Sequence, residues 1–272
     1  MIDTARSVLF VPGDRPERFA KAVATGADCV VLDLEDAVLA DAKPAARQAV
    51  RDWFLGGGRG AIRVNAAETP WHAEDLALLS LPGVSAVLLP KAADPGEIAR
   101  LRAAAPELPV AALVETARGI CRASELAAVP GVARLLFGSV DYQNDTGIED
   151  DGQGLLHARS ALVVASAAAG LAGPVDGVTL ALGDPGQLAR DCAAARALGM
   201  AGKLCIHPRQ VADVAAAFGP RPGEAEEARR IVAAADAEGA QGAFQLDGRL
   251  IDRPVVERAR RLLARGNQRE PA

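Results

Sequence analysis

The chain has 272 residues, and its 35 acidic residues outnumber its 30 basic residues to give a formal net charge of −5 at pH 7. Half of the residues are apolar and 24% are charged, a balance that is typical of a globular protein with a large core and that excludes disordered and collagen-like chains. A mildly acidic chain has no broad cationic surface, so a nucleic-acid partner is not expected.

Short β-branched runs alternate with longer Ala-rich segments along most of the chain, a pattern typical of βα units around a parallel sheet. Strands are predicted at Ser7–Val11, Cys29–Leu34, Ala61–Val64, Ala86–Leu89, Val110–Val114, Arg134–Phe137, Gly177–Leu182 and Lys203–Ile206, each followed by a helix. Helix starts are indicated by two capping-box spacings, Asp14 with Glu17 and Asp94 with Glu97, and by the pairs Thr69-Pro70 and Asp184-Pro185. Eight such units predict an α/β fold, a (β/α)8 TIM barrel over residues 1–219.

The main alternative is an open doubly wound sheet, which requires a glycine-rich phosphate-binding turn after its first strand. No such turn follows Ser7–Val11, and the glycine cluster at Gly56–Gly60 leads into a strand rather than a helix. The barrel is therefore favoured.

A second part of the chain follows the barrel. Pro220, Pro222 and Gly223 predict a break, after which a helix over Glu224–Glu238, a turn-rich segment over Gly239–Asp252 and a last helix over Val255–Ala264 are expected. Residues 220–272 are thus predicted to be a C-terminal helical extension that packs in an oligomer or forms a lid over a site.

The cysteines and the apolar runs indicate the compartment. Cys29, Cys121, Cys192 and Cys205 lie far apart, without the paired spacing of zinc or redox motifs, and are expected to be reduced thiols. The apolar stretch Val8–Val11 is too short for a signal peptide, and the longest uncharged run is shorter than the ~18 apolar residues of a membrane span. We therefore expect a cytoplasmic protein that has no membrane segment.

Polar residues gather where the predicted strands end, which is where barrel enzymes place their catalytic groups. They are Asp14, Asp33, Glu35, Asp36, Arg63, Asn65, Lys91, Glu115, Asp141, Asp184 and His207. Glu115 and Asp141 end neighbouring units, and carboxylates without a Cys or His cluster suit Mg²⁺. The alternative for these two is a structural ion pair with Arg63, Lys91 or Arg118.

Three other groups at these ends have expected roles. The planar guanidinium of Arg63 suits a substrate carboxylate, although a simple ion pair is again the alternative. Side chains alternate along a strand, so Asp33, Glu35 and Asp36 cannot all point inward, and Glu35 and Asp36 are expected to support the metal and its waters. Asp184 is expected to cap a helix and His207 to have an orienting or structural role.

Several of these residues lie in motifs that resemble a known family. The stretches RSVLFVPGDRPERFAKA, VVLDLEDAV, IRVN, LLPKA, VETARG, FGSVDY and GKLCIHPRQV are similar, in register from Arg6 to Leu263, to the citrate lyase beta-subunit-like family, which includes malyl-CoA and citramalyl-CoA lyases. The resemblance implies a trimeric, Mg²⁺-dependent barrel that cleaves or forms 3-hydroxyacyl-CoA thioesters, with acetyl-CoA or a homologue and a 2-oxo acid as the other reactants.

The resemblance also assigns residues. Glu115 and Asp141 match the metal ligands, and Arg63 matches the arginine that holds the substrate carboxylate. Lys21 and Lys43 fall where the family meets CoA phosphates. Within GAFQLDGRLIDRPVV, Asp252 (rather than Asp247) matches the catalytic acid that a neighbouring subunit supplies.

One departure and three alternatives remain open. Many members carry Glu-Asp-Leu where this chain has Val140, Asp141 and Tyr142, so the substrate pocket is expected to differ. The same site with a water molecule would make a 3-hydroxyacyl-CoA thioesterase, and a carrier-borne acyl group would make the chain the beta subunit of a citrate lyase complex. A non-catalytic scaffold that binds CoA or a metal is disfavoured by the full set of Arg63, Glu115, Asp141 and Asp252. The acidic run from Asp145 to Asp151 is expected to be a solvated loop.

Overall fold

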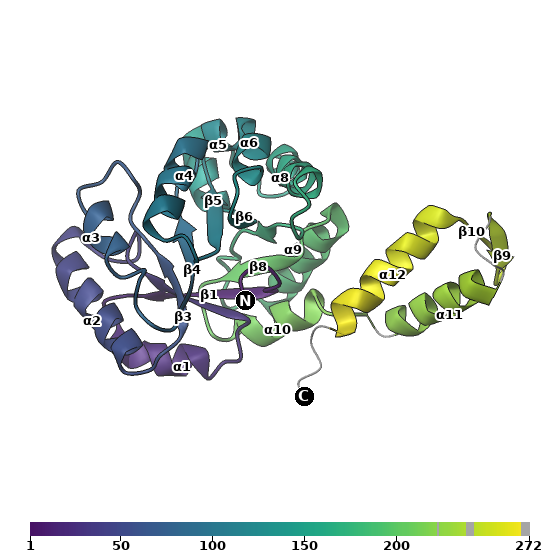
Figure 1. The fold of residues 1–272 in the computed structure, drawn as a ribbon, viewed down its shortest axis with the longest axis horizontal. Helices are drawn as coiled ribbons and strands as arrows, with labels where there is room; N and C mark the ends of the chain where they lie inside the picture. Colours follow the sequence, from purple (N-terminus) through teal and green to yellow (C-terminus); the bar gives the residue numbers. More distant parts are fainter. Residues whose placement is uncertain (222, 238–241, 268–272) are drawn as a thin grey trace. The chain divides into compact units, whose positions relative to one another are not determined.

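The computed structural model describes residues 1–221, 223–237 and 242–267, and it divides into two compact units, Met1–Phe218 and Gly219–Ala272. In the first unit, eight parallel strands close in chain order, with β1 paired to both β2 and β8 (Figure 1). The strands are β1 (Ser7–Pro12), β2 (Cys29–Asp33), β3 (Gly60–Arg63), β4 (Val84–Leu89), β5 (Val110–Val114), β6 (Val132–Phe137), β7 (Val175–Asp176) and β8 (Gly202–Cys205). The predicted (β/α)8 TIM barrel is confirmed.

Helices connect successive strands and surround the barrel (Figure 1). They are the short 3-10 turns Pro16–Arg18 and Ala40–Ala42, and α1 (Phe19–Val23), α2 (Lys43–Leu55), α3 (His72–Leu76), α4 (Pro95–Ala104), α5 (Ala117–Cys121), α6 (Ala123–Ala127), α7 (Ser139–Thr146), α8 (Leu156–Ala168), α9 (Pro185–Leu198) and α10 (Gln210–Ala217).

Alternation along each strand builds two apolar layers. In β5, Ala111 and Leu113 point into the barrel, where they pack with Val31 and Leu204, while Val110, Ala112 and Val114 contact the helices outside. Buried alanine, valine, leucine and isoleucine side chains fill the interior, so the barrel is a packed core whose functional groups must project from its rim.

The amino-terminal ends of the strands are closed by the start of the chain. Arg134 of β6 is buried, and its Nη1 donates hydrogen bonds to the carbonyl oxygens of Ile2, Asp3 and Ala5 at 3.2, 3.1 and 2.6 Å. Its Nε donates to the carbonyl oxygen of Gly173 at 2.9 Å. This end of the barrel is therefore a structural plug.

Two of the predicted helix starts are confirmed and two are wrong. Asp94 and Asp184 each accept a hydrogen bond from a backbone N–H of the first helical turn, as caps do. The helical turn after β1 instead begins at Pro16 with Arg15 before it, so Asp14 stands one residue too early to cap it. The Thr69 hydroxyl donates to the carbonyl oxygen of Ala66 at 2.7 Å, which closes a turn, and α3 begins only at His72.

The predicted strand Gly177–Leu182 is also wrong. β7 consists of Val175–Asp176, and the apolar residues after it form a loop in which Leu180 and Leu182 are exposed. A Cβ on Gly177 would lie 2.2 Å from Ser139 Oγ, so the chain leaves the sheet where it packs against the start of α7.

The second unit, taken by itself, is a helical hairpin with a small sheet. It contains α11 (Glu224–Ala237), the antiparallel pair β9 (Phe244–Leu246) and β10 (Arg249–Ile251), and α12 (Arg253–Asn267). The buried residues Ala228, Ile231, Ala235, Ile251, Val256 and Ala259 form its core. Glu238 and residues 268–272 lie outside the described residues.

The β9–β10 hairpin corrects the expectation of a turn-rich segment at Gly239–Asp252. Its turn is Asp247-Gly248, and both residues have a positive φ, of 51° and 77°. An Asp-Gly pair between short apolar runs is the sequence signal of such a hairpin, and it was present in the chain. In the part of the chain that the structure describes, no helix combines the length and apolar character needed to cross a membrane.

Candidate active site

The carboxyl ends of β2 and β3 bring Asp33 and Arg63 into a buried, two-pronged ion pair. Arg63 Nε donates to Asp33 Oδ1 at 2.7 Å, and Nη2 donates to Asp33 Oδ2 at 2.5 Å. The third nitrogen, Nη1, lies 2.9 Å from Glu35 Oε2. Burial alone would lower the pKa of Arg63, but the charges of Asp33 and Glu35 raise it above its usual value. Arg63 is thus a fixed cation in the barrel mouth.

Glu35 is the next member of this chain of charges. Asp33 Oδ1 accepts the Glu35 N–H at 2.9 Å, which fixes the turn after β2, and Glu35 Oε1 lies 3.3 Å from Lys91 Nζ. Burial raises the pKa of Glu35 to about 7, with Asp36 and Asp33 adding to the rise and Arg63 and Lys91 opposing it. Asp36 is exposed at the same turn. The expected alternation is therefore observed, with Asp33 and Glu35 turned inward.

Glu115 follows β5 and is almost fully buried. Its Oε1 accepts the backbone N–H of Lys91 at 2.7 Å. Burial raises the pKa of Glu115 to about 8, and the nearby charges of Glu35 and Asp141 add to the rise. The Glu115 carboxyl group is thus held in place by a neighbouring backbone N–H, and the charge of Arg63 only partly offsets the rise in its pKa.

Asp141 lies in the first turn of α7, four residues beyond the end of β6, rather than on the strand end itself. Burial raises the pKa of Asp141, Asp36 adds to the rise, and a hydrogen bond with the Glu115 side chain lowers it. The structure therefore brings Glu115 and Asp141 into direct contact, as two acids that repel one another when both are ionised.

The residues around this pair fit a divalent cation of the Mg²⁺ type. Five carboxylates gather with two cations at the mouth: Asp33, Glu35, Asp36, Glu115 and Asp141 with Arg63 and Lys91. Among the described residues there is no group of three or more His, Cys, Asp or Glu side chains placed to hold a metal. Two carboxylates, with waters and substrate oxygens completing the octahedron, are the usual protein ligands of Mg²⁺. The excess negative charge at the pair would be neutralised by such an ion.

The two lysines expected at CoA phosphates have different environments. Lys21 is exposed on α1. Lys43 is buried, its ammonium donates to the carbonyl oxygens of Leu34 and Glu35 at 2.8 and 3.0 Å, and it lies 4.9 Å from the centre of the Trp71 ring. Lys43 therefore braces the turn that carries Glu35, and only Lys21 presents a free-standing surface cation.

The residues that flank Asp141 do not form one substrate wall. Tyr142 is buried against Phe137, with ring centres 5.6 Å apart, in the layer between barrel and helices. Val140 lines a small outer cavity of about 240 Å³ together with Ser139, Gln143 and the loop after β7. Asp145 was expected in a solvated loop but lies on α7, where it accepts the Ala117 N–H at 2.7 Å.

His207 and Asp252 have local hydrogen-bond partners. His207 Nδ1 accepts the Arg209 N–H at 3.1 Å in the turn after β8. Asp252 belongs to the second unit, where its Oδ1 accepts the Val255 N–H at 3.2 Å at the start of α12. Asp247, the less favoured of the two acids, forms an ion pair with Arg230 at 3.0 Å.

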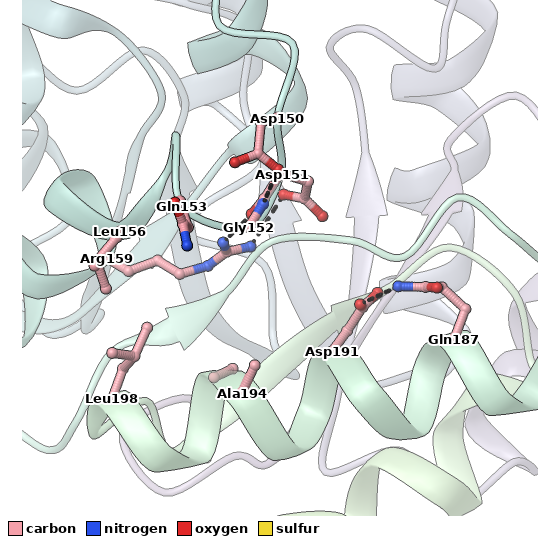
Figure 2. Close-up of a pocket in the computed structure, with 11 residues that line it drawn as sticks. Asp150, Asp151, Gly152, Gln153, Leu156, Arg159, Gln187, Asp191, Ala194 and Leu198 are labelled. Carbon is pink, nitrogen blue, oxygen red and sulfur yellow. Dashed lines mark hydrogen bonds and ion pairs between the residues drawn. The ribbon is translucent and has the colours of Figure 1, made fainter.

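A larger cavity of about 520 Å³ lies on the outside of the barrel, between α8 and α9 (Figure 2). Asp150, Asp151 and Arg159 stand on one side of it, and Asp191, Ala194 and Leu198 of α9 stand on the other (Figure 2). Arg159 is occupied by Asp151 and by the buried Asp176, which also binds Lys203. Because none of the predicted site residues lines this cavity, the site remains at the barrel mouth.

Comparisons with known proteins identify the family to which the chain is similar. The model of the HpcH/HpaI aldolase/citrate lyase family matches residues 6–208. A citrate lyase subunit beta-like protein of Deinococcus radiodurans is 40% identical, over 95% of this chain and 96% of that protein. A (3S)-malyl-CoA thioesterase of Cereibacter sphaeroides is 34% identical, over 96% of this chain and 94% of that protein.

A solved structure is similar over nearly the whole chain. Protein CitE of Mycobacterium tuberculosis, in complex with magnesium, acetoacetate and coenzyme A, superimposes with a TM-score of 0.84 at 37% identity. The match covers 97% of this chain and 98% of that chain.

Proposed function

The chain belongs to the HpcH/HpaI aldolase/citrate lyase family, and from that premise we propose that it is a Mg²⁺-dependent carbon–carbon lyase acting on 3-hydroxyacyl-CoA thioesters. Cleavage would yield acetyl-CoA, or a homologue, and a 2-oxo acid. The observation that carries the proposal is the contact between Glu115 and Asp141 beside the fixed cation Arg63. Magnesium and coenzyme A in the similar CitE structure support the same assignment.

Glu115 and Asp141 would hold the metal, and Glu35 and Asp36 would accept hydrogen bonds from its waters. When bound, Mg²⁺ would polarise the carbonyl of the 2-oxo acid as a Lewis acid. Two N–H groups of Arg63 donate to Asp33, and Nη1 forms an ion pair with Glu35, so the remaining N–H groups of the guanidinium would orient the carboxylate of the oxo acid.

Proton transfer would be the work of carboxylates. In cleavage, a carboxylate takes the proton of the 3-hydroxyl group, the bond between the hydroxyl-bearing carbon and the α-carbon breaks, and its electron pair passes into the thioester enolate. Asp252, supplied by a neighbouring copy as in the resembling lyases, would protonate that enolate, and in the synthetic direction it would remove the α-proton of the acyl-CoA. Lys21 would bind a CoA phosphate, and the working form would be a cytoplasmic homotrimer.

A second candidate is a 3-hydroxyacyl-CoA thioesterase. The observation that favours it is the 34% identity to a (3S)-malyl-CoA thioesterase across nearly the full length of both chains. In that case the same carboxylates would position a water molecule at the thioester, and the carbon skeleton would stay intact.

Mass spectrometry separates these readings. The chain is incubated with Mg²⁺, acetyl-CoA or propionyl-CoA and a panel of 2-oxo acids, and in reverse with (S)- and (R)-malyl-, citramalyl- and citryl-CoA. EDTA and Glu115→Gln serve as controls. A metal-dependent condensation or cleavage product supports the lyase and names the oxo acid, whereas free CoA with an intact acid supports the thioesterase. Turnover only with an acyl group on a copurifying carrier protein would replace both with a citrate lyase beta subunit.

A further inference from the structure

Lys91 has a backbone conformation that its residue type does not favour. It follows β4 with a φ of 51°, and Asp247 is the other non-glycine residue with a positive φ in the described part of the chain. Asp247 occupies a hairpin turn, where this conformation is usual. Lys91 occupies a rim position, and a left-handed lysine there costs free energy that a glycine would not.

The hydrogen bond made by the Lys91 backbone explains the conformation but not the choice of lysine at this position. Its N–H donates to Glu115 Oε1 at 2.7 Å, so the conformation aims the peptide group at the proposed metal ligand. Glycine would make the same hydrogen bond and would remove the steric cost of the Cβ. The presence of lysine therefore points to a use for its side chain.

The side chain reaches the exposed end of the buried charges. Lys91 Nζ lies 3.3 Å from Glu35 Oε1, and the Lys91 side chain is 39% exposed, against 5% for Glu35 and 10% for Arg63. Of the two cations in the cluster, Lys91 is thus the one whose side chain can move toward an incoming molecule while its backbone stays fixed.

The charges show why an anionic substrate needs this lysine. The single positive charge of Arg63 faces two carboxylates, Asp33 and Glu35. Asp36 adds a further negative charge nearby. A carboxylate that approached Arg63 would therefore also meet the negative charges of Asp33 and Glu35. Lys91 supplies the second positive charge, and, against the lowering effect of burial, the charges of Glu35, Asp36 and Glu115 raise the pKa of its ammonium group.

We propose that Lys91 is a further substrate-binding residue, whose ammonium binds the carboxylate of the 2-oxo acid together with Arg63 while its backbone N–H positions Glu115. This proposal rests on the proposed function, because it needs a 2-oxo acid at the barrel mouth. It also explains the left-handed backbone, since one residue must aim its peptide N–H inward and its side chain toward the opening.

The test uses calorimetric titration of the intact protein with Mg²⁺ alone, with pyruvate or oxaloacetate in the presence of Mg²⁺, and with CoA. Lys91→Gly keeps the N–H and relieves the backbone. We expect its melting temperature to equal or exceed that of the wild type and its Mg²⁺ affinity to stay within about twofold. Its 2-oxo acid affinity should fall about 10- to 100-fold, the loss that removal of one hydrogen bond to a charged group produces.

Two further variants separate the side chain from the backbone. Lys91→Arg should recover most of the oxo-acid affinity, whereas Lys91→Met should lose it, and CoA affinity should stay unchanged in both. Unaltered oxo-acid affinity in Lys91→Gly would overturn the inference, and so would parallel losses of stability, Mg²⁺ and oxo acid in all three variants. If the wild-type chain bound no 2-oxo acid, the proposed function itself would fail.

Discussion

The Glu115 carboxyl group occupies the space that a side chain at position 138 would take. A Cβ on Gly138 would lie 2.2 Å from Glu115 Oε2 and 2.5 Å from its Cβ. Gly138 lies between β6 and α7. The residue that leaves space for the Glu115 side chain therefore also leads the chain into the helix that carries Asp141. The geometry of the proposed metal site therefore depends on a missing side chain.

Gly138→Ala should displace Glu115 and weaken Mg²⁺ binding by about 10- to 100-fold, the usual effect of losing a group that orients a metal ligand. Calorimetric titration with Mg²⁺ measures this directly. Gly183→Ala is the matched control, because a Cβ there meets nothing within 4 Å and the backbone needs no positive φ. Equal Mg²⁺ affinity in both variants would show that the absence of a side chain at position 138 is not needed to position Glu115.

Asp252→Asn should lower turnover by about 10²- to 10⁴-fold, as expected for loss of a positioned acid or base, and leave Mg²⁺ binding unchanged. Asparagine caps a helix as well as aspartate does, so α12 should keep its Val255 contact. Steady-state kinetics measures the loss of turnover, and circular dichroism checks that the helix content is unchanged. Asp247→Asn, which removes the acid in the turn of the preceding hairpin, should keep near-normal turnover, and full activity of Asp252→Asn would exclude the proposed role.

The metal-free protein should lose stability as the pH rises from about 4.5 to 8. The pKa values of Glu35 and Glu115 are raised to about 7 and about 8, above the ordinary 4.5 of an unfolded chain. Between these limits the unfolded state releases protons that the folded state retains, so a rise in pH favours unfolding. Thermal melts in EDTA at several pH values measure the effect.

Mg²⁺ should reverse this trend, because it binds the ionised carboxylates. The melting temperature should rise more on adding Mg²⁺ at pH 8 than at pH 6, and binding at pH 7 should release protons, which calorimetry in buffers of different ionisation enthalpy detects. Glu115→Gln should flatten the pH dependence. A metal-free stability that is constant from pH 5 to pH 8 would contradict the charge arrangement described for the mouth.

Arg63→Ala should lower the free energy of unfolding by about 3–5 kcal/mol, because it leaves the buried Asp33 and Glu35 without their shared cation. Urea denaturation gives the value. Asp36→Asn, which changes an exposed acid of the same turn, should shift stability by no more than about 0.5 kcal/mol. A small effect of Arg63→Ala would mean that solvent screens the pair far better than its burial indicates.

Lys21 and Lys43 should respond in opposite ways. Lys43→Met leaves the carbonyl oxygens of Leu34 and Glu35 without their donor and should cost about 1–3 kcal/mol of stability, with CoA affinity unchanged in the fraction that folds. Lys21→Ala should weaken CoA binding and leave stability unchanged. Melting temperatures and CoA titrations of both variants decide the matter, and a loss of CoA affinity confined to Lys43→Met would reverse the assignment.

Much of the barrel could be predicted from the chain because its signals are local. Short β-branched runs between Ala-rich segments marked seven of the strands within a few residues. Asp94 and Asp184 were recognisable as caps because a cap bonds to its own helix. The strand at Gly177–Leu182 was misplaced because its apolar residues have the right composition, whereas the end of β7 depends on the distant Ser139.

The site residues also include some that local sequence signals predicted and some whose roles depend on distant contacts. The sequence by itself determined that acids and an arginine follow successive strands, since a parallel barrel gathers the carboxyl ends of its strands at one rim. It did not distinguish the exposed Lys21 from the buried Lys43. Nor did it show that the Glu115 side chain occupies the space beside Gly138, or that Lys91 adopts a left-handed backbone conformation. Those features were decided by the tertiary structure, because burial, close approach and the direction of a backbone N–H depend on groups that are far apart in the chain.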